Sequence, residues 1–284
     1  MFIKYFVQMK WLQQGFDFFI NSSIHVALSV YALSWMTLLE FELPYDKNVL
    51  YAIFFATISG YNFVKYFGLA KFHHRRLENR LKWIQILSFI SFVLMVFYSL
   101  KLHKPTLIIL GIFGLITFLY AIPFLPKRLL MDKNHNLRSI SGIKIHVIAL
   151  VWSGVTVGIP LINNAYEIDT DVAIVLLQRF AFVMVLMLPF EIRDLQYDSL
   201  RLSTIPQKIG VKLTKIMGIL LLMVFYISNF FKDAINHKLL LSYLVITLIT
   251  ATFLLLSKER QPKFYSSFWV ESIPIIWLVL TLIL

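Results

Sequence analysis

The chain has 284 residues, of which 59% are hydrophobic and 15% charged, and its mean hydropathy is +0.75. Soluble domains contain about 45–50% apolar and about 25% charged residues, so this composition excludes a soluble protein of this size. The sequence has no cysteine, which excludes disulfides and thiolate sites, and its net charge of +12 fits basic loops at a membrane face or a polyanionic substrate rather than nucleic acid.

Long apolar segments bounded by charges or proline run through the chain. A helix that crosses a bilayer of about 30 Å needs about 20 apolar residues. Residues 1–19 lack a small-residue cleavage site, so we expect an interfacial lead-in rather than a signal peptide. Nine transmembrane helices are predicted, at about 22–41, 48–69, 83–100, 105–124, 145–162, 172–190, 214–231, 239–257 and 266–284.

The distribution of positive charge predicts how these helices are oriented. The N-terminal segment and every second loop carry 21 of the 27 lysines and arginines, the intervening loops carry 5, and Arg179 lies inside a helix. Because basic loops stay on the cytoplasmic side, this split predicts a cytoplasmic N-terminus and an opposite C-terminus. The long basic loops recur every four helices, so we expect an all-α membrane protein of two four-helix halves plus one helix. No linker divides residues 1–284, which predicts one domain.

Three acidic residues at the end of the sixth predicted helix share one helix face, because Glu191, Asp194 and Asp198 are spaced i, i+3 and i+7. Carboxylates this close repel each other unless a cation bridges them, and Mg²⁺ commonly binds one or two carboxylates plus substrate phosphates. The pattern predicts a Mg²⁺ site with these three residues as ligands and with Asp194 and Asp198 as catalytic residues. The alternative is a solvated helix end whose acids pair with Arg193, Arg201 and Lys208.

The segment E-I-R-D-x-x-x-D from Glu191 to Asp198, followed by T-I-P-Q-K-I-G at 204–210, resembles the second aspartate-rich motif of the UbiA-type intramembrane prenyltransferases, especially the menaquinone-branch members. The resemblance implies nine helices, two aspartate-rich motifs that hold Mg²⁺ on a prenyl diphosphate, and transfer of the isoprenoid to an acceptor. It covers the whole chain as topology. As sequence it covers about residues 57–80, 118–144 and 189–210.

The first aspartate-rich motif of that family, N-D-x-x-D-x-x-x-D, is not retained. Asn62 matches its first position, but the carboxylate positions are occupied by Phe63, Tyr66 and Ala70. Two mechanisms stay open. Either Lys65 or Lys71 replaces one magnesium ion on the diphosphate, with a single ion left on Asp194 and Asp198, or the site binds an isoprenoid or lipid without chemistry.

Three loops, at about 63–82, 125–144 and 191–213, are expected to form the cytoplasmic site. By position, Tyr120 and the pair Lys127 and Arg128 are similar to residues that line the diphosphate pocket of the family, and Arg193 lies beside the acids. The predicted diphosphate-binding residues are Asn62, Lys65, Lys71, Tyr120, Lys127, Arg128 and Arg193. The alternative for each basic residue is a positive-inside anchor.

The resemblance implies a prenyltransferase that uses a prenyl diphosphate, Mg²⁺ and an acceptor that the sequence does not identify. The same residues are compatible with a non-catalytic isoprenoid- or lipid-binding homologue. A small-molecule transporter is a further alternative, although its charges would be expected near the midplane of both halves rather than at one face. From the resemblance and the absence of a targeting peptide, we expect a multi-pass protein of a bacterial cytoplasmic membrane.

Overall fold

The computed structural model describes residues 2–66, 79–122, 144–196, 204–234 and 236–284. Within these ranges the secondary structure is helical and contains no strand, as the composition predicts. The α-helices are α1 (Phe2–Asn21), α2 (Ile24–Glu40), α3 (Lys47–Tyr66), α4 (Asn79–Ser99), α5 (Lys104–Ala121), α6 (Lys144–Ser153), α7 (Ile159–Asn163), α8 (Thr170–Asp194), α9 (Ile205–Ile227), α10 (His237–Leu256) and α11 (Ile273–Ile283).

Each of the nine predicted segments contains a helix in the part of the chain that is described. The π-helix η4 (Gly154–Gly158) joins α6 to α7, the 3₁₀ turn η6 (Ser228–Phe231) extends α9, and the π-helix η7 (Tyr265–Val270) precedes α11. Seven helical units are long and apolar enough to cross a membrane, and the bent pair formed by α1 and α2 would make eight. The chain is therefore an integral, multi-pass membrane protein, while the count of nine spans and their orientation stay predictions.

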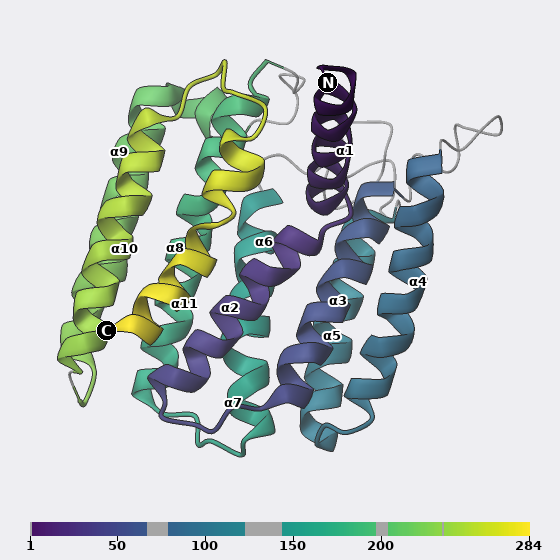
Figure 1. The fold of residues 1–284 in the computed structure, drawn as a ribbon. Coiled ribbons are helices and arrows are strands. Elements are labelled where there is room, and N and C mark those ends of the chain that lie inside the picture. The colour runs from purple at the N-terminus through teal and green to yellow at the C-terminus, as the bar shows by residue number, and fades with distance from the viewer. Residues whose placement is uncertain (1, 67–78, 123–143, 197–203, 235) are drawn as a thin grey trace, which may run out of the picture.

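The helices form one bundle, in which the last helix packs on the first long helix, α2 (Figure 1). Helices α3, α4 and α5 lie on one side, and α8, α9 and α10 lie on the other, with α2 and α6 between them. The last helix, α11, packs on both α10 and α2 and so joins the C-terminal part to the first long helix. An aromatic cluster fills the contact between α8, α9, α10 and α11, and its members are Phe182, Phe225, Tyr243 and Trp277.

Buried charged residues join the helices at the end of the bundle where α2 stops. Arg179 on α8 is 1% exposed and donates to the carbonyl oxygen of Leu33 at 2.8 Å, so it pairs inside the bundle rather than reaching the interface. Nearby, the ammonium of Lys232 lies 2.5 Å from Glu40, which also accepts a hydrogen bond of 2.7 Å from Tyr243. This end is therefore closed by side-chain pairs between α2, η6, α8 and α10.

The chain bends by 56° between α1 and α2, and Asn62 of α3 holds this bend. Asn62 accepts a hydrogen bond from the Ser23 hydroxyl at 2.8 Å and donates to the Ser22 carbonyl at 3.0 Å and to the Ser88 hydroxyl at 2.8 Å. Ser23 has a φ of 64°, a left-handed conformation that a non-glycine residue seldom adopts. Three helices thus converge on one buried amide.

Asn62→Ala should destabilise the fold, because it removes three hydrogen bonds that serve a bent backbone in an apolar setting. At about 1 kcal/mol for each bond, we expect a loss of about 2–3 kcal/mol, or about 5 °C or more in the apparent Tm. The measurement is thermal unfolding in detergent followed by circular dichroism. Asn164→Ala, which removes one bond to the Pro160 carbonyl, is the control. Equal Tm values for the two variants would contradict this account of the bend.

Candidate functional site

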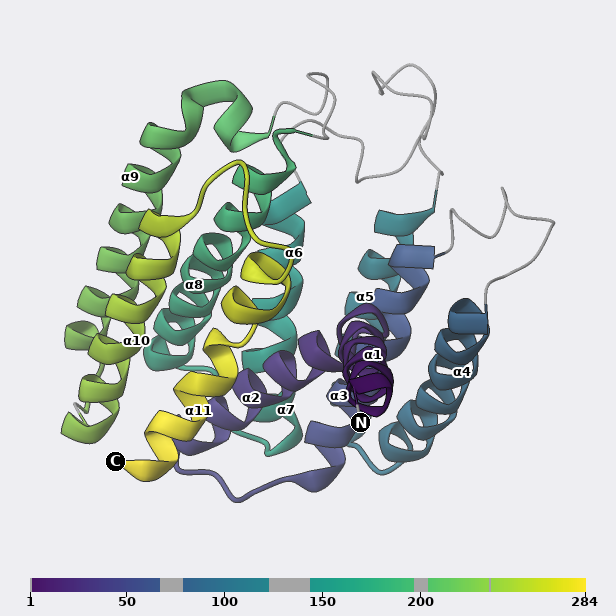
Figure 2. The same ribbon diagram turned by 45° about the horizontal axis from the view of Figure 1, so that its top comes forward.

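The predicted site residues that the structure describes lie at one end of the bundle, opposite the Glu40 and Lys232 pair (Figure 2). This end is formed by the last turns of α3, α5 and α8 and by the first turn of α6. These end turns contain Asn62, Lys65, Tyr120, Glu191, Arg193 and Asp194. The predicted residues Lys71, Lys127, Arg128 and Asp198, and the motif position Ala70, lie outside the described residues.

Local sequence determines where α8 and α9 begin, at opposite ends of the bundle. The side chain of Asp169 caps α8 by accepting from the Val172 amide at 2.9 Å. Helix α9 begins in a capping box, in which Thr204 and Gln207 satisfy each other's backbone amides. Gly210 then adopts a φ of 78°, which glycine tolerates without steric cost, and the helix is broken there. The threonine and glycine of the T-I-P-Q-K-I-G segment therefore have structural roles.

The acids of α8 are already paired with cations. Lys144, the first residue of α6, lies 3.2 Å from Glu191 and 3.7 Å from Asp194. Arg193 contacts Asp194 through Nη2 at 2.7 Å and through Nε at 2.8 Å. The expected alternative in which the acids pair with basic neighbours is thus correct for Arg193. Lys144 ends the loop at about 125–144 that was expected at the site, but it was not singled out as a binding residue, because only the fold brings the start of α6 to the end of α8.

These residues do not fit the two-metal arrangement that the resemblance implies. Among the described residues, no group of three or more acidic or histidine side chains could hold a metal ion. Glu191 and Asp194 contact Lys144, and two carboxylate positions of the first motif are Phe63 and Tyr66. Phe63 stacks on Phe118 of α5 with ring centroids 5.6 Å apart, so this position is part of an apolar wall.

The residues of α3 that precede the first loop make contacts inside the protein. Lys65 donates to the Ser23 hydroxyl at 2.9 Å, and Tyr66 donates to the Asn21 carbonyl at 2.9 Å. Together with Asn62, they tie α3 to the break between α1 and α2. Their predicted role toward a diphosphate stays a prediction, and for Asn62 the structure adds a structural role.

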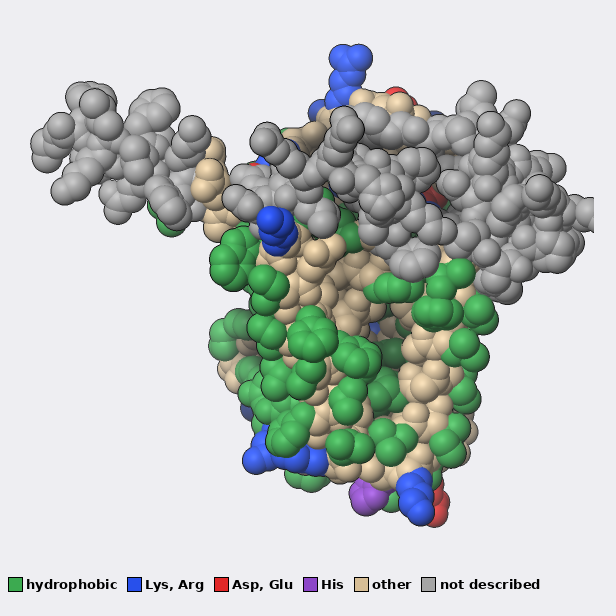
Figure 3. Space-filling view, turned by 90° about the vertical axis from the view of Figure 1, so that its right-hand side faces the viewer, with side chains coloured by type: hydrophobic (Ala, Val, Ile, Leu, Met, Phe, Trp, Pro, Cys, Tyr) green, Lys and Arg blue, Asp and Glu red, His purple; other side chains and the backbone are tan. Residues whose placement is uncertain are grey.

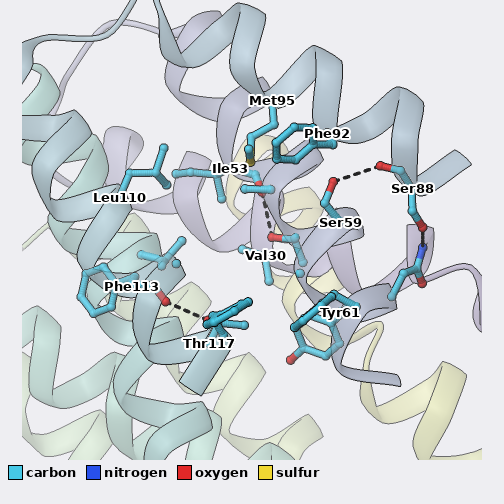
Figure 4. A pocket seen from close by; sticks show the side chains of 18 of the residues that line it. Val30, Ile53, Ser59, Tyr61, Ser88, Phe92, Met95, Leu110, Phe113 and Thr117 are labelled. Atoms are coloured by element: carbon cyan, nitrogen blue, oxygen red, sulfur yellow. Dashed lines mark hydrogen bonds between the residues drawn. The ribbon is translucent and has the colours of Figure 1, made fainter. Parts of the chain in front are cut away.

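A cavity of about 1240 Å³ lies between α3, α4, α5 and α6. Its walls are mainly apolar, and Tyr61, Asn62 and Tyr66 line it together with Trp152, whose indole donates to the Tyr61 hydroxyl at 2.7 Å. Figure 4 shows the side chains of Ser59, Ser88 and Thr117 among the apolar groups around this space. On the side of the molecule that carries α4 and α5, Figure 3 shows a hollow bordered by hydrophobic side chains.

Behind this cavity, a buried histidine pairs with an acid of η7 and α11. His25 is 2% exposed, and its Nδ1 lies 3.4 Å from Glu271 while its Nε2 lies 2.9 Å from the Ser272 hydroxyl. The His25 ring stacks on Phe268 at a centroid distance of 5.0 Å. Sequence reasoning missed His25, although an acid inside an apolar segment was a signal for a partner.

Three solved structures have a similar fold. A UbiA homologue from Aeropyrum pernix K1 aligns with a TM-score of 0.62 and 13% identity over 93% of this chain and 98% of that one. A digeranylgeranylglyceryl phosphate synthase in membranes gives 0.52 and 16% over 93% and 92%. A UbiA homologue from Archaeoglobus fulgidus bound to GPP and Mg²⁺ gives 0.51 and 10% over 93% and 95%.

No protein-family model matches the sequence, and no curated protein matches it significantly. The structural matches extend over nearly the whole of each chain, and all three concern the same group of proteins. They confirm, at the level of the fold, the resemblance seen in the segment from Glu191 to Gly210. The chain has the fold of the UbiA-type intramembrane prenyltransferases.

Proposed function

We propose that this protein is a membrane prenyltransferase that binds a prenyl diphosphate and transfers the isoprenoid to an acceptor. The observation that carries the proposal is a large apolar cavity whose lining includes Asn62 and Tyr66, at the charged end of the bundle. A prenyl diphosphate has the same division into an apolar chain and a polyanionic head. The GPP bound to the Archaeoglobus fulgidus homologue, which shares the fold, supports this class of ligand.

The chemistry would begin with ionisation of the allylic diphosphate. The bond between C1 and the diphosphate oxygen breaks, and its electron pair leaves with the diphosphate. Cations at the ends of α3, α6 and α8 would stabilise this developing charge in a site from which lipid and helices exclude water. The aromatic faces of Tyr61 and Trp152 line the cavity and would stabilise the allylic cation. The acceptor then attacks C1 and releases a proton.

A non-catalytic isoprenoid-binding protein is the second candidate. The observation that favours it is the replacement of motif carboxylates by Phe63, which stacks on Phe118, and by Tyr66, which donates to a backbone carbonyl. Both side chains line the cavity. Such a protein would keep the apolar cavity and lose the groups that stabilise a leaving diphosphate.

Binding of geranyl diphosphate to the purified protein in detergent tests the proposal. We expect geranyl diphosphate to bind more tightly than geraniol, which lacks the diphosphate, because charge-assisted contacts to the diphosphate are among the stronger hydrogen bonds. Slow release of diphosphate from the bound ligand indicates an enzyme, and Asp194→Asn should reduce that release. Binding without any release favours the second candidate. The absence of geranyl diphosphate binding, with Mg²⁺ and with a chelator, would refute the prenyltransferase, and the absence of geraniol binding as well would refute the second candidate.

Filling the cavity should weaken binding of the isoprenoid chain. Gly114 lines the cavity, and a Cβ built there meets no atom within 4 Å, so Gly114→Leu can place its side chain in the space without a backbone clash. We expect weaker binding of geranyl diphosphate and a larger loss for a longer prenyl diphosphate, measured by calorimetry. Gly158→Leu is the matched control, since Gly158 also has open space but does not line the cavity. Equal affinities of the two variants for geranyl diphosphate would show that the isoprenoid chain does not bind in this cavity.

A further inference from the structure

The contact between the start of α6 and the end of α8 has an unusual charge arrangement. The Lys144 ammonium lies at the first residue of α6, and the carboxylates of Glu191 and Asp194 lie in the last turn of α8. A helix dipole favours negative charge at its N-terminus and positive charge at its C-terminus. Each of these helix ends therefore carries the sign that its own dipole disfavours.

Mutual pairing compensates these unfavourable placements. Glu191 is 3% exposed, and Lys144 lies 3.2 Å from its Oε1. A buried carboxylate needs a partner, because an unpaired charge in an apolar environment costs several kcal/mol. The position next to Glu191 and Asp194, where a divalent cation would have to sit, is thus occupied by an ammonium group of this chain.

The pairing leaves hydrogen-bond donors for a ligand. A lysine ammonium has three N–H donors and a guanidinium has five, whereas Asp194 takes only the Nε and Nη2 donors of Arg193. Lys144 is 25% exposed and Arg193 is 31% exposed, so neither cation is sealed by its acids. Two carboxylates held against two cations also leave no net negative charge to attract a divalent metal ion.

On the α3 side of the site, the sequence also differs from the family pattern by having less negative charge. On α3, where the family has carboxylates, this chain has Phe63 and Tyr66, and Lys65 adds a cation. Mg²⁺ requires oxygen ligands; Phe63 has no side-chain oxygen, and the Tyr66 hydroxyl donates to the Asn21 carbonyl. Neither half of the described site therefore offers the set of carboxylates that would hold the metal ions of a diphosphate complex.

We propose that Lys144 takes the place of a divalent metal ion between Glu191 and Asp194, so that the diphosphate is recognised by cations of the protein, without magnesium. This inference rests on the proposed function, since it concerns the same diphosphate. In it, Glu191 and Asp194 are positioning residues that hold Lys144 and Arg193, and the two cations contact the ligand. The predicted Mg²⁺ cofactor would then be dispensable for binding.

The first experiment measures the Kd of geranyl diphosphate with excess Mg²⁺ and with EDTA. We expect the wild-type Kd in the two buffers to agree within about threefold, and Lys144→Gln to weaken binding at least about tenfold in EDTA, as for loss of a charge-assisted contact. Lys144→Arg should restore most of the affinity. Lys258→Gln, at an exposed lysine of the same end of the bundle, is the matched control and should bind like wild type.

If Lys144→Gln does not fold because Glu191 loses its partner, the double variant with Glu191→Gln removes both charges and is measured instead. Wild-type binding that disappears in EDTA and returns with Mg²⁺, together with normal binding by the lysine variant, would overturn the inference while leaving the proposed function intact. No binding in either buffer would instead refute the proposed function, and this inference with it.

A second measurement uses the metal alone. Mn²⁺ binds the same oxygen ligands as Mg²⁺ and is detected by electron paramagnetic resonance. We expect Asp194→Asn to leave Mn²⁺ binding unchanged from wild type, because Lys144 occupies the position between Glu191 and Asp194. Lys144→Gln should create Mn²⁺ binding, since it removes the ammonium that lies between Glu191 and Asp194. Tight Mn²⁺ binding in wild type that is lost in Asp194→Asn would show that the acids hold a metal despite Lys144.

Discussion

A backbone in lipid must satisfy its own hydrogen bonds, and this constraint organises the whole structure. Unbroken helices meet it without help, which is why the described residues are helical. Where a helix ends or bends inside the bundle, a carbonyl is freed and a polar side chain from another segment can bind it. The pairs are Asn62 with Ser22, Gln178 with Phe225, Gln261 with Pro189 and Ser29 with Glu271. Several buried polar side chains therefore lie where the helices are interrupted.

Charged side chains follow a different rule, because they gather at the two ends of the bundle. At one end Lys232 pairs with Glu40, and Arg179 donates to the Leu33 carbonyl. These side chains are almost inaccessible to solvent, so this end of the bundle is closed. At the other end Lys144 and Arg193 are paired but remain partly exposed. The same kind of ion pair thus closes one end and leaves donors accessible at the other. The lining of the apolar cavity reaches the second end at Asn62 and Tyr66, so a ligand with a charged head and an apolar chain fits this asymmetry.

The hydrophobic pattern predicted the helices well, because the length of an apolar run directly reflects the thickness of the bilayer. It also located the acids of α8, since spacing along one helix is local information. It could not predict that Lys144 meets these acids, because that contact joins two helices. It likewise assigned Asn62 only a ligand role, whereas the fold places its amide in the bend between α1 and α2. Local patterns therefore locate helices, whereas the contacts between helices come from the structure.

The two departures from the family pattern are best understood together. Replacing carboxylates by Phe63 and Tyr66 removes negative charge from one half of the site and extends the apolar wall. That change alone would leave Glu191 and Asp194 as a half-site with excess negative charge, which would repel a diphosphate. Lys144 neutralises this half-site, and Lys65 adds positive charge on the other side. Both changes make the site more positive. The loss of the first motif and the pairing of the second motif's acids with Lys144 and Arg193 are therefore consistent with one change, in which the protein's own cations bind the diphosphate.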